Sequence, residues 1–184
     1  PDPAGLTLAL ITRAQIALAE RDLASARVLA ERARNTAAAA FGEAHLYTQS
    51  AELIRLDQRL EAGEAAEALP AALALLAAMT EQYGADTRWL AEPLLIVAAA
   101  RSELRAYDLA LADLERARAI ATREQLPSVL AVVDLQQARV LWDSKRDRPR
   151  ARELARAAAE AHRSGGALRE LAEAEQWLRE HPLP

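Results

Sequence analysis

The stretch Arg105–Ala117, RAYDLALADLERA, decides the fold of this chain. It predicts a tight turn followed by a helix that packs a large residue, Tyr107, and three residues later a small one, Ala110. The same plan occurs three more times along the sequence. The small residues of the four copies lie 42, 42 and 41 residues apart and are Ala26, Ala68, Ala110 and Ala151. A fixed period of this length is typical of proteins built from stacked repeats.

The composition favours helices and argues against several classes of protein. Of the 184 residues, 52% are apolar, only 4% are aromatic and about a quarter are Ala, which is the best helix former. The net charge of −4 and the lack of a basic stripe argue against nucleic-acid binding. The chain has no Cys for a disulfide, a thiol nucleophile or a Cys-based metal site. No apolar run approaches the ~20 residues needed to span a bilayer.

Turn and capping signals predict nine helices, arranged as four antiparallel pairs and a final capping helix. The helices are expected at about residues 6–20, 22–40, 43–62, 65–82, 86 or 92–105, 107–123, 128–142, 147–163 and 168–180. We therefore expect an all-α, right-handed α-solenoid that forms one structural domain. Its parts are a lead-in (1–5), four repeats (6–42, 43–84, 85–126 and 127–166) and a capping helix with a tail (167–184).

The spacing of the repeated residues resembles the second-helix pattern of the tetratricopeptide repeat (TPR). Tyr107, Ala110, Leu114 and Ala117 follow this pattern, and Leu23–Ala33 follows it in the first copy. The period of about 42 is longer than the usual 34 of that family. The resemblance implies stacked helix pairs that bind a protein or peptide, with no cofactor.

The family also places a small packing residue in the first helix of each pair. Ala14 and Ala98 take that position, whereas Leu56 departs from it and Arg139 departs strongly. We therefore expect the first helices to be less regular than the second ones.

The C-terminal part has a narrower resemblance. Val140–Asp147 (VLWDSKRD), Ala151–Ala161 and Glu173–His181 (EAEQWLREH) resemble the repeats that follow the catalytic domain of bacterial eukaryotic-type Ser/Thr kinases. The chain itself has no Gly-rich phosphate loop, no His-Arg-Asp run and no Asp-Phe-Gly. The resemblance implies a regulatory or docking part of a larger, cytoplasmic bacterial signalling protein. The alternative is an effector-sensing or oligomerisation repeat domain of a bacterial transcription activator.

No set of residues predicts catalysis or metal binding. His45, His162 and His181 lack the spacing of metal ligands, and the paired carboxylates lie among arginines, as in solvated ion pairs. Ser164–Gly166 follows a helix and has no Lys, which indicates a helix C-cap and not a phosphate loop. The three Trp residues are expected to be packing residues. An α-helical enzyme would instead need a deep pocket with converging carboxylates.

The better candidate site is a surface, the concave face lined by the first helices of the pairs. The repeat register predicts an apolar ladder there, flanked by Glu61, Glu92 and Glu103. Its members are Ile11, Gln15 and Leu18; Leu53, Asp57 and Leu60; Leu95, Ala99 and Ser102; and, to within one residue, Gln136, Val140 and Asp143.

This face would suit a peptide that carries apolar anchors and some positive charge. The alternative is that the apolar residues are buried against the neighbouring helix pair. The expected partner is a protein or peptide, without nucleic acid or membrane insertion, and self-association stays open.

Overall fold

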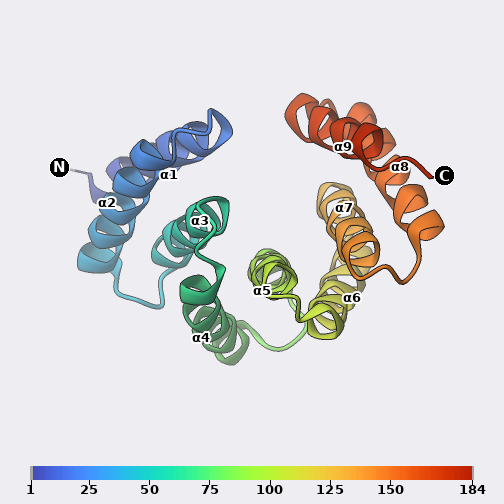
Figure 1. The fold of residues 1–184 in the computed structure, drawn as a ribbon. Helices are drawn as coiled ribbons and strands as arrows, with labels where there is room; N and C mark the ends of the chain where they lie inside the picture. The colour runs from blue at the N-terminus through green and yellow to red at the C-terminus, as the bar shows by residue number, and fades with distance from the viewer. Residues whose placement is uncertain (1, 184) are drawn as a thin grey trace. The chain divides into compact units, whose positions relative to one another are not determined.

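The computed structural model describes residues 2–183, in which all regular structure is helical and no strand occurs. The predicted all-α class and the nine α-helices are confirmed within these residues (Figure 1). The helices are α1 (Pro3–Ala19), α2 (Leu23–Phe41), α3 (Leu46–Glu61), α4 (Ala65–Tyr83), α5 (Ala91–Glu103), α6 (Tyr107–Arg123), α7 (Pro127–Asp143), α8 (Arg148–Gly165) and α9 (Leu168–Glu180). A short 3-10 helix, η1 (Arg88–Leu90), precedes α5. Across residues 2–183, every helix is too short or too polar to cross a membrane.

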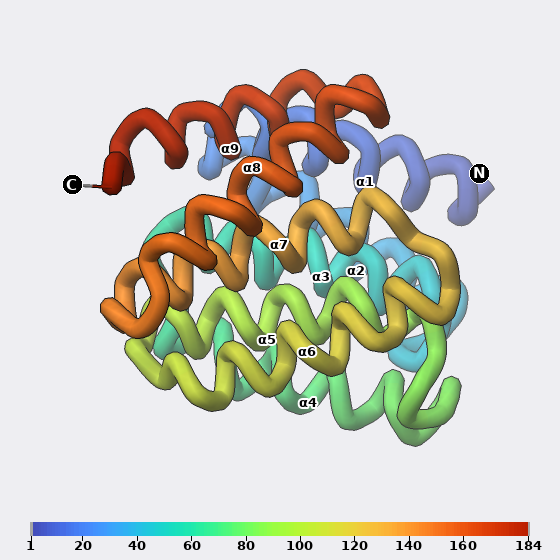
Figure 2. Tube along the Cα trace, turned by 90° about the vertical axis from the view of Figure 1, so that its right-hand side faces the viewer, coloured from blue at the N-terminus to red at the C-terminus, as the bar shows by residue number. Residues whose placement is uncertain are grey.

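The chain folds as two compact units, which divide between residues 85 and 86. Unit 1 contains α1 to α4, where each helix packs on the next and α1 also contacts α3. Unit 2 contains η1 and α5 to α9, where each α-helix again packs on the next and α5 also contacts α7. Short turns make successive helices of a unit antiparallel (Figure 2). In both units, therefore, the first helices of successive pairs touch each other.

The small residue of each second helix lies at the joint of its pair. Ala26, Ala68, Ala110 and Ala151 are all completely buried, as the repeat pattern predicts. Because Ala has only a methyl side chain, it lets the backbones of two helices approach closely. The larger residues of the pattern, such as Leu23 and Tyr107, are only half-buried at the start of their helices.

The first helix of every pair ends in the same turn. The residue after the helix cap has a left-handed backbone, with φ of 60° at Arg21, 77° at Gly63, 59° at Arg105 and 59° at Lys145. The next N–H then donates to a carbonyl five residues earlier, for example Ala106 to Arg101 at 2.8 Å and Arg146 to Leu141 at 3.1 Å. This hydrogen bond is the signature of the Schellman motif, which satisfies carbonyls left over at a helix end.

These turns correct one assignment made from the sequence. The turn residues Arg105 and Lys145 are 40 residues apart, and not 41 as the second-helix alanines suggest. The counterpart of Ala98 is therefore Ala138, which is completely buried, so Arg139 does not occupy the small packing position. The counterparts of Leu95, Ala99 and Ser102 become Leu135, Arg139 and Trp142.

Local capping moves two predicted helix boundaries. Helix α1 begins at Pro3, and not at Leu6, because the Asp2 carboxylate accepts the Ala4 N–H at 3.0 Å and Pro is favoured in a first turn. The predicted lead-in 1–5 therefore contains helix. Helix α3 begins at Leu46, three residues later than predicted, after His45 accepts the Tyr47 N–H at 3.2 Å.

The tryptophans of unit 2 differ in burial. Trp177 is buried in the core between α7, α8 and α9, and Trp142 meets it edge-to-face with ring centroids 5.7 Å apart. Trp89 is 44% exposed and is therefore much less buried than Trp177, which is 7% exposed.

Candidate functional site

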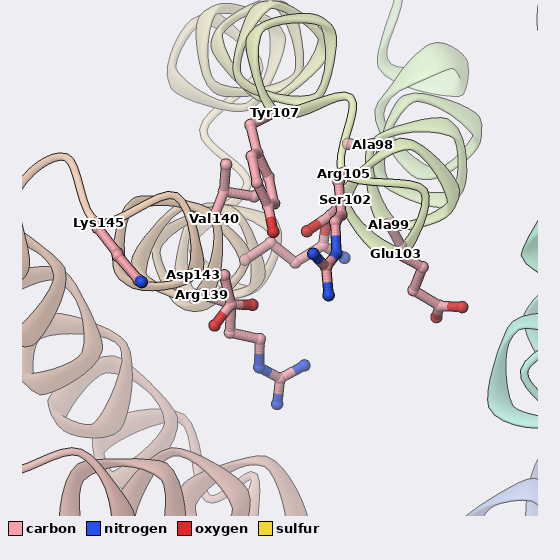
Figure 3. Close-up of a pocket in the computed structure, with 11 residues that line it drawn as sticks. Ala98, Ala99, Ser102, Glu103, Arg105, Tyr107, Arg139, Val140, Asp143 and Lys145 are labelled. Carbon is pink, nitrogen blue, oxygen red and sulfur yellow. The ribbon is translucent and has the colours of Figure 1, made fainter.

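The candidate site is a hollow of about 600 Å³ within unit 2. It lies between α5 and α7, beside the turns that follow them (Figure 3). The residues that line this hollow are Ala98, Ala99, Ser102, Glu103, Arg105, Tyr107, Gln136, Arg139, Val140, Asp143 and Lys145.

Small side chains of α5 create the space. Ala98 and Val140 are buried and form an apolar floor. Ala99 and Ser102 lie on the same side of α5 and are also short, so this helix leaves room that larger residues would fill. The hollow is thus a consequence of which residues the first helix carries, while the helix pair itself remains closely packed.

The two turns place cations at the rim. Arg105 and Lys145 are the left-handed residues that end α5 and α7, and both side chains are exposed. The same turn leads into α6, whose first residue, Tyr107, directs its hydroxyl group into the hollow (Figure 3). Because the turn geometry is fixed by backbone hydrogen bonds, these side chains start from defined positions.

Two side chains of α7 provide polar groups to the hollow. The Arg139 guanidinium forms an ion pair with Glu173 of α9. Gln136 has a buried side-chain oxygen that accepts no hydrogen bond from the described residues. A buried acceptor without a donor costs free energy, and because protein atoms cover this oxygen it is not open to a group in the hollow.

The two carboxylates of the hollow do not converge. Glu103 on α5 and Asp143 on α7 extend in different directions (Figure 3). Within residues 2–183, no three or more His, Cys, Asp or Glu side chains are grouped to hold a metal ion. The arrangement therefore suits polar recognition better than acid–base chemistry, which requires two groups that reach the same substrate atom or its neighbour.

Ion pairs behind the hollow hold its helices together. Arg101 of α5 pairs with Asp113 of α6, where burial raises the pKa of the Asp113 carboxyl and the neighbouring Arg101 opposes this effect. Arg146, before α8, donates to Asp108 of α6 at 2.6 Å, and this hydrogen bond lowers the pKa of Asp108. The scaffold around the hollow is thus fixed by charges that do not face it.

The structure divides the predicted surface residues into three groups. Those that line the hollow are Ala99, Ser102, Glu103, Gln136, Val140 and Asp143. Those that are exposed elsewhere are Gln15, Asp57, Glu61 and Glu92. Those that are buried are Ile11, Leu53, Leu60, Leu95 and, again, Val140, while Leu18 is half-buried against the core of unit 1.

The burial of the third group corrects the expected apolar ladder. Within each unit the first helices of successive pairs contact each other, and the large apolar side chains Ile11, Leu53, Leu60 and Leu95 of these helices are buried. For Ile11 the structure agrees with the alternative of burial against the neighbouring pair, because it shares a core with Ala51 and Ile54 of α3. The surface that stays accessible is polar.

Five residues that line the hollow were not among the predicted site residues. They are Ala98, Arg105, Tyr107, Arg139 and Lys145. Tyr107 was interpreted only as a packing residue, and Arg139 as a defect in the repeat. The sequence did contain a signal for the two cations of the rim. Arg105 and Lys145 occupy the turn position that Gly63 occupies in the second pair, where a side chain is not favoured by the left-handed backbone.

Comparison with protein-family models finds none that matches the chain, and comparison with curated proteins finds no matching sequence. The function is therefore inferred from the geometry of the hollow and from the repeat pattern.

Proposed function

We propose that this chain is a non-catalytic protein-interaction module that binds a peptide or protein segment in the hollow of unit 2. The observation that carries the proposal is the combination of an apolar floor with a rim of charged side chains from two helices and the turns that follow them. An extended segment offers backbone N–H groups, side chains of both charges and small apolar groups, and these match such a lining.

The proposed architecture is a right-handed α-solenoid of the TPR type. Three features support it: the repeated Schellman turn, the buried Ala at each joint, and the contact between successive first helices in each unit. The resemblance of Val140–Asp147 and Glu173–His181 supports a place as the regulatory or docking part of a larger bacterial signalling protein, such as a Ser/Thr kinase.

The charges of the hollow refine the ligand expected from the sequence. Its rim carries three cations (Arg105, Arg139 and Lys145) and two anions (Glu103 and Asp143). The hollow therefore suits a segment of mixed charge, and not only the positively charged peptide that the sequence predicts. The bound segment carries at least one acidic side chain near Arg105 and Lys145, because these two cations flank the opening and are exposed.

A displayed library of random peptides, selected on the intact chain, tests the proposal. Selected peptides are expected to bind with measurable affinity by fluorescence anisotropy, and to lose about tenfold or more, ~1.4 kcal/mol, with Lys145→Glu or Arg105→Glu. The matched control is Arg21→Glu, since Arg21 is also an exposed cation with a left-handed backbone, but it lies in unit 1.

Two results would overturn the proposal. One is a library that yields no binder at micromolar concentrations of the chain. The other is a set of binders whose affinity is unchanged by the reversed charges at the hollow, or is reduced equally by Arg21→Glu. Catalytic turnover of the bound peptide would also contradict the non-catalytic assignment.

A further inference from the structure

Helix α1 carries an exposed stripe without charge. The stripe consists of Gly5, Leu8, Thr12, Ile16 and Ala19, which are spaced 3, 4, 4 and 3 residues apart and therefore share one face of the helix. Leu8 is 45% exposed and Ile16 is 51% exposed, which is unusual for two large apolar residues on one helix face. We call this surface the α1 stripe.

The second pair of unit 1 shows what normally covers such a face. The caps of α1 and α3, Glu20 and Ala62, lie 42 residues apart, so each α1 residue has a defined counterpart in α3. The counterparts of Thr12 and Ile16 are Ile54 and Gln58, which are both 4% exposed. The counterparts of Gly5 and Leu8 are the half-buried Tyr47 and Ser50, and that of Ala19 is the exposed Glu61.

On α3, neighbouring helices cover this face. Helices α1 and α2 both contact α3, and Ala51 and Ile54 belong to the same core as the apolar residues of α1 and α2. At Thr12 and Ile16, α1 thus exposes positions that α3 buries beneath neighbouring helices, and no helix of unit 1 covers them.

We propose that this face is covered by α1 of a second copy of the chain, packed antiparallel to form a two-fold symmetric dimer. The spacing of the stripe is the same in both directions from Thr12. In an antiparallel pair centred on Thr12, Leu8 lies opposite the partner's Ile16, and Gly5 lies opposite the partner's Ala19. A two-fold interface requires such a self-complementary patch, and the small residues at both ends let the helices approach.

The charges and the size of the stripe favour this occupant. Arg13 is the only charged residue of α1, and it lies beside the stripe. Apart from the Asp2 carboxylate, which lies against Gly5 at one end, the stripe offers a charged partner no opposite charge, whereas a second stripe buries mainly uncharged groups. One pair of 17-residue helices, each ~25 Å long, buries less than the ~800 Å² per partner of a standard interface. The dimer is therefore weak, with a dissociation constant in the micromolar range.

The dimer does not depend on the hollow, because every residue of the hollow lies in unit 2. Sedimentation equilibrium of the intact chain at about 1 to 200 μM is expected to show a monomer that converts to a dimer as concentration rises. The double substitution Leu8→Glu and Ile16→Glu places four carboxylates in the interface and is expected to leave a monomer at every concentration. The control is Val28→Glu on α2, because Val28 is equally exposed but lies outside the stripe, and this variant is expected to dimerise normally.

Cysteine cross-linking identifies the geometry. The natural chain has no Cys, so a single Thr12→Cys substitution has no competing thiol. It is expected to form a disulfide-linked dimer under mild oxidation, since residue 12 faces its own copy on the two-fold axis. The matched control is Thr122→Cys, an exposed threonine of α6.

The two experiments can either support or overturn the proposed dimer. Rapid linkage through residue 12, slow linkage through residue 122 and a monomeric double variant support the dimer. A monomer across the whole concentration range would overturn it, as would linkage at residue 12 that is no faster than at residue 122. If the double variant is unfolded by circular dichroism, the cross-linking rates alone decide.

Discussion

Helix α5 makes two contacts of opposite character. Towards α6 it forms a joint in which Ala110, Leu114 and Ala117 are completely buried. Towards α7 it borders the hollow, where Ala99 and Ser102 leave space and charged side chains surround it. The joint follows a pattern that occurs four times in the sequence, whereas the hollow depends on residues that differ between the first helices. The difference agrees with the function proposed above, in which the repeated joints form the frame and the variable first helices carry the recognition surface.

The largest expected effect is at the joint. Leu114→Ala should destabilise unit 2 by ~2–5 kcal/mol, because it removes a completely buried side chain and leaves a cavity. Urea denaturation followed by Trp fluorescence measures this effect, since Trp89, Trp142 and Trp177 all lie in unit 2. Leu109→Ala on the same helix is the control, because Leu109 is exposed and its loss should change stability little. Equal effects of both substitutions would mean that the joint is not the frame of the unit.

Overfilling the joint should cost less than emptying it. Ala110→Leu inserts a larger side chain where a completely buried methyl group separates two helices, and should destabilise unit 2 by ~1–3 kcal/mol. Ala112→Leu, at an exposed position of α6, is the matched control in the same denaturation experiment. An Ala110→Leu chain as stable as the control would show that the small residue is not required for close helix contact.

A capping side chain before the first residue of α6 should stabilise unit 2. Asp22 and Asp147 cap α2 and α8 by accepting N–H groups of Ser25 and Arg150, whereas α6 has Ala106 at the equivalent position and no side-chain cap. Ala106→Asp should therefore stabilise unit 2 by ~1 kcal/mol at neutral pH. Urea midpoints at neutral pH measure the gain, and a variant no more stable than the natural chain would contradict it.

The stabilisation by Ala106→Asp should be lost as the pH falls. Hydrogen bonds from Ser25 lower the pKa of Asp22 below 3.8, so the folded state favours the charged carboxylate. A capping Asp at 106 should behave alike, with its stabilisation present above the unfolded-state pKa of ~3.9 and lost as the pH falls through the lower folded-state value. Urea midpoints of the variant and the natural chain should therefore converge in acid, and a gain that persists at pH 2 would not come from a carboxylate cap.

The smallest stability effect is expected at the hollow itself. Arg105→Gly relieves the left-handed backbone of a residue with a side chain, but glycine also gains more freedom in the unfolded chain, so the net change should be within ~0.5 kcal/mol. Binding of library-selected peptides should nevertheless fall, because a rim cation is lost. A large loss of stability would place Arg105 in the frame and not in the recognition surface.

Turn chemistry and spacing predicted most of the frame. The nine helices and the turn at Arg105 are local features, since each depends on residues within one or two helical turns of one another. The four small residues at the joints were predicted from the repeat, which marks the same position in each second helix. The failures were at α1 and α3, where the caps Asp2 and His45 shifted the helix starts by three residues. A single accepted hydrogen bond decides such a boundary, and more than one candidate cap was present in each stretch.

The hollow was predicted only in part. Ser102, Gln136 and Asp143 were assigned to a binding face from the repeat register, and they do line it. The apolar ladder of Leu53 and Leu95 was placed on the same face but is buried. Sequence periodicity shows that an apolar residue lies on a helix face, but it does not show whether another helix covers that face.

The sequence by itself determined that the chain is helical, where its turns lie and which small residues form the joints, because these depend on short-range hydrogen bonding and on side-chain size. Only the tertiary structure decided which apolar residues are buried and which face of α1 is left uncovered. It also set the register of α7 at 40 residues from α5 and brought Arg105, Arg139 and Lys145 around one hollow. The physical reason is that these properties belong to contacts between helices that are far apart in the chain, where one residue of register moves a side chain to another face.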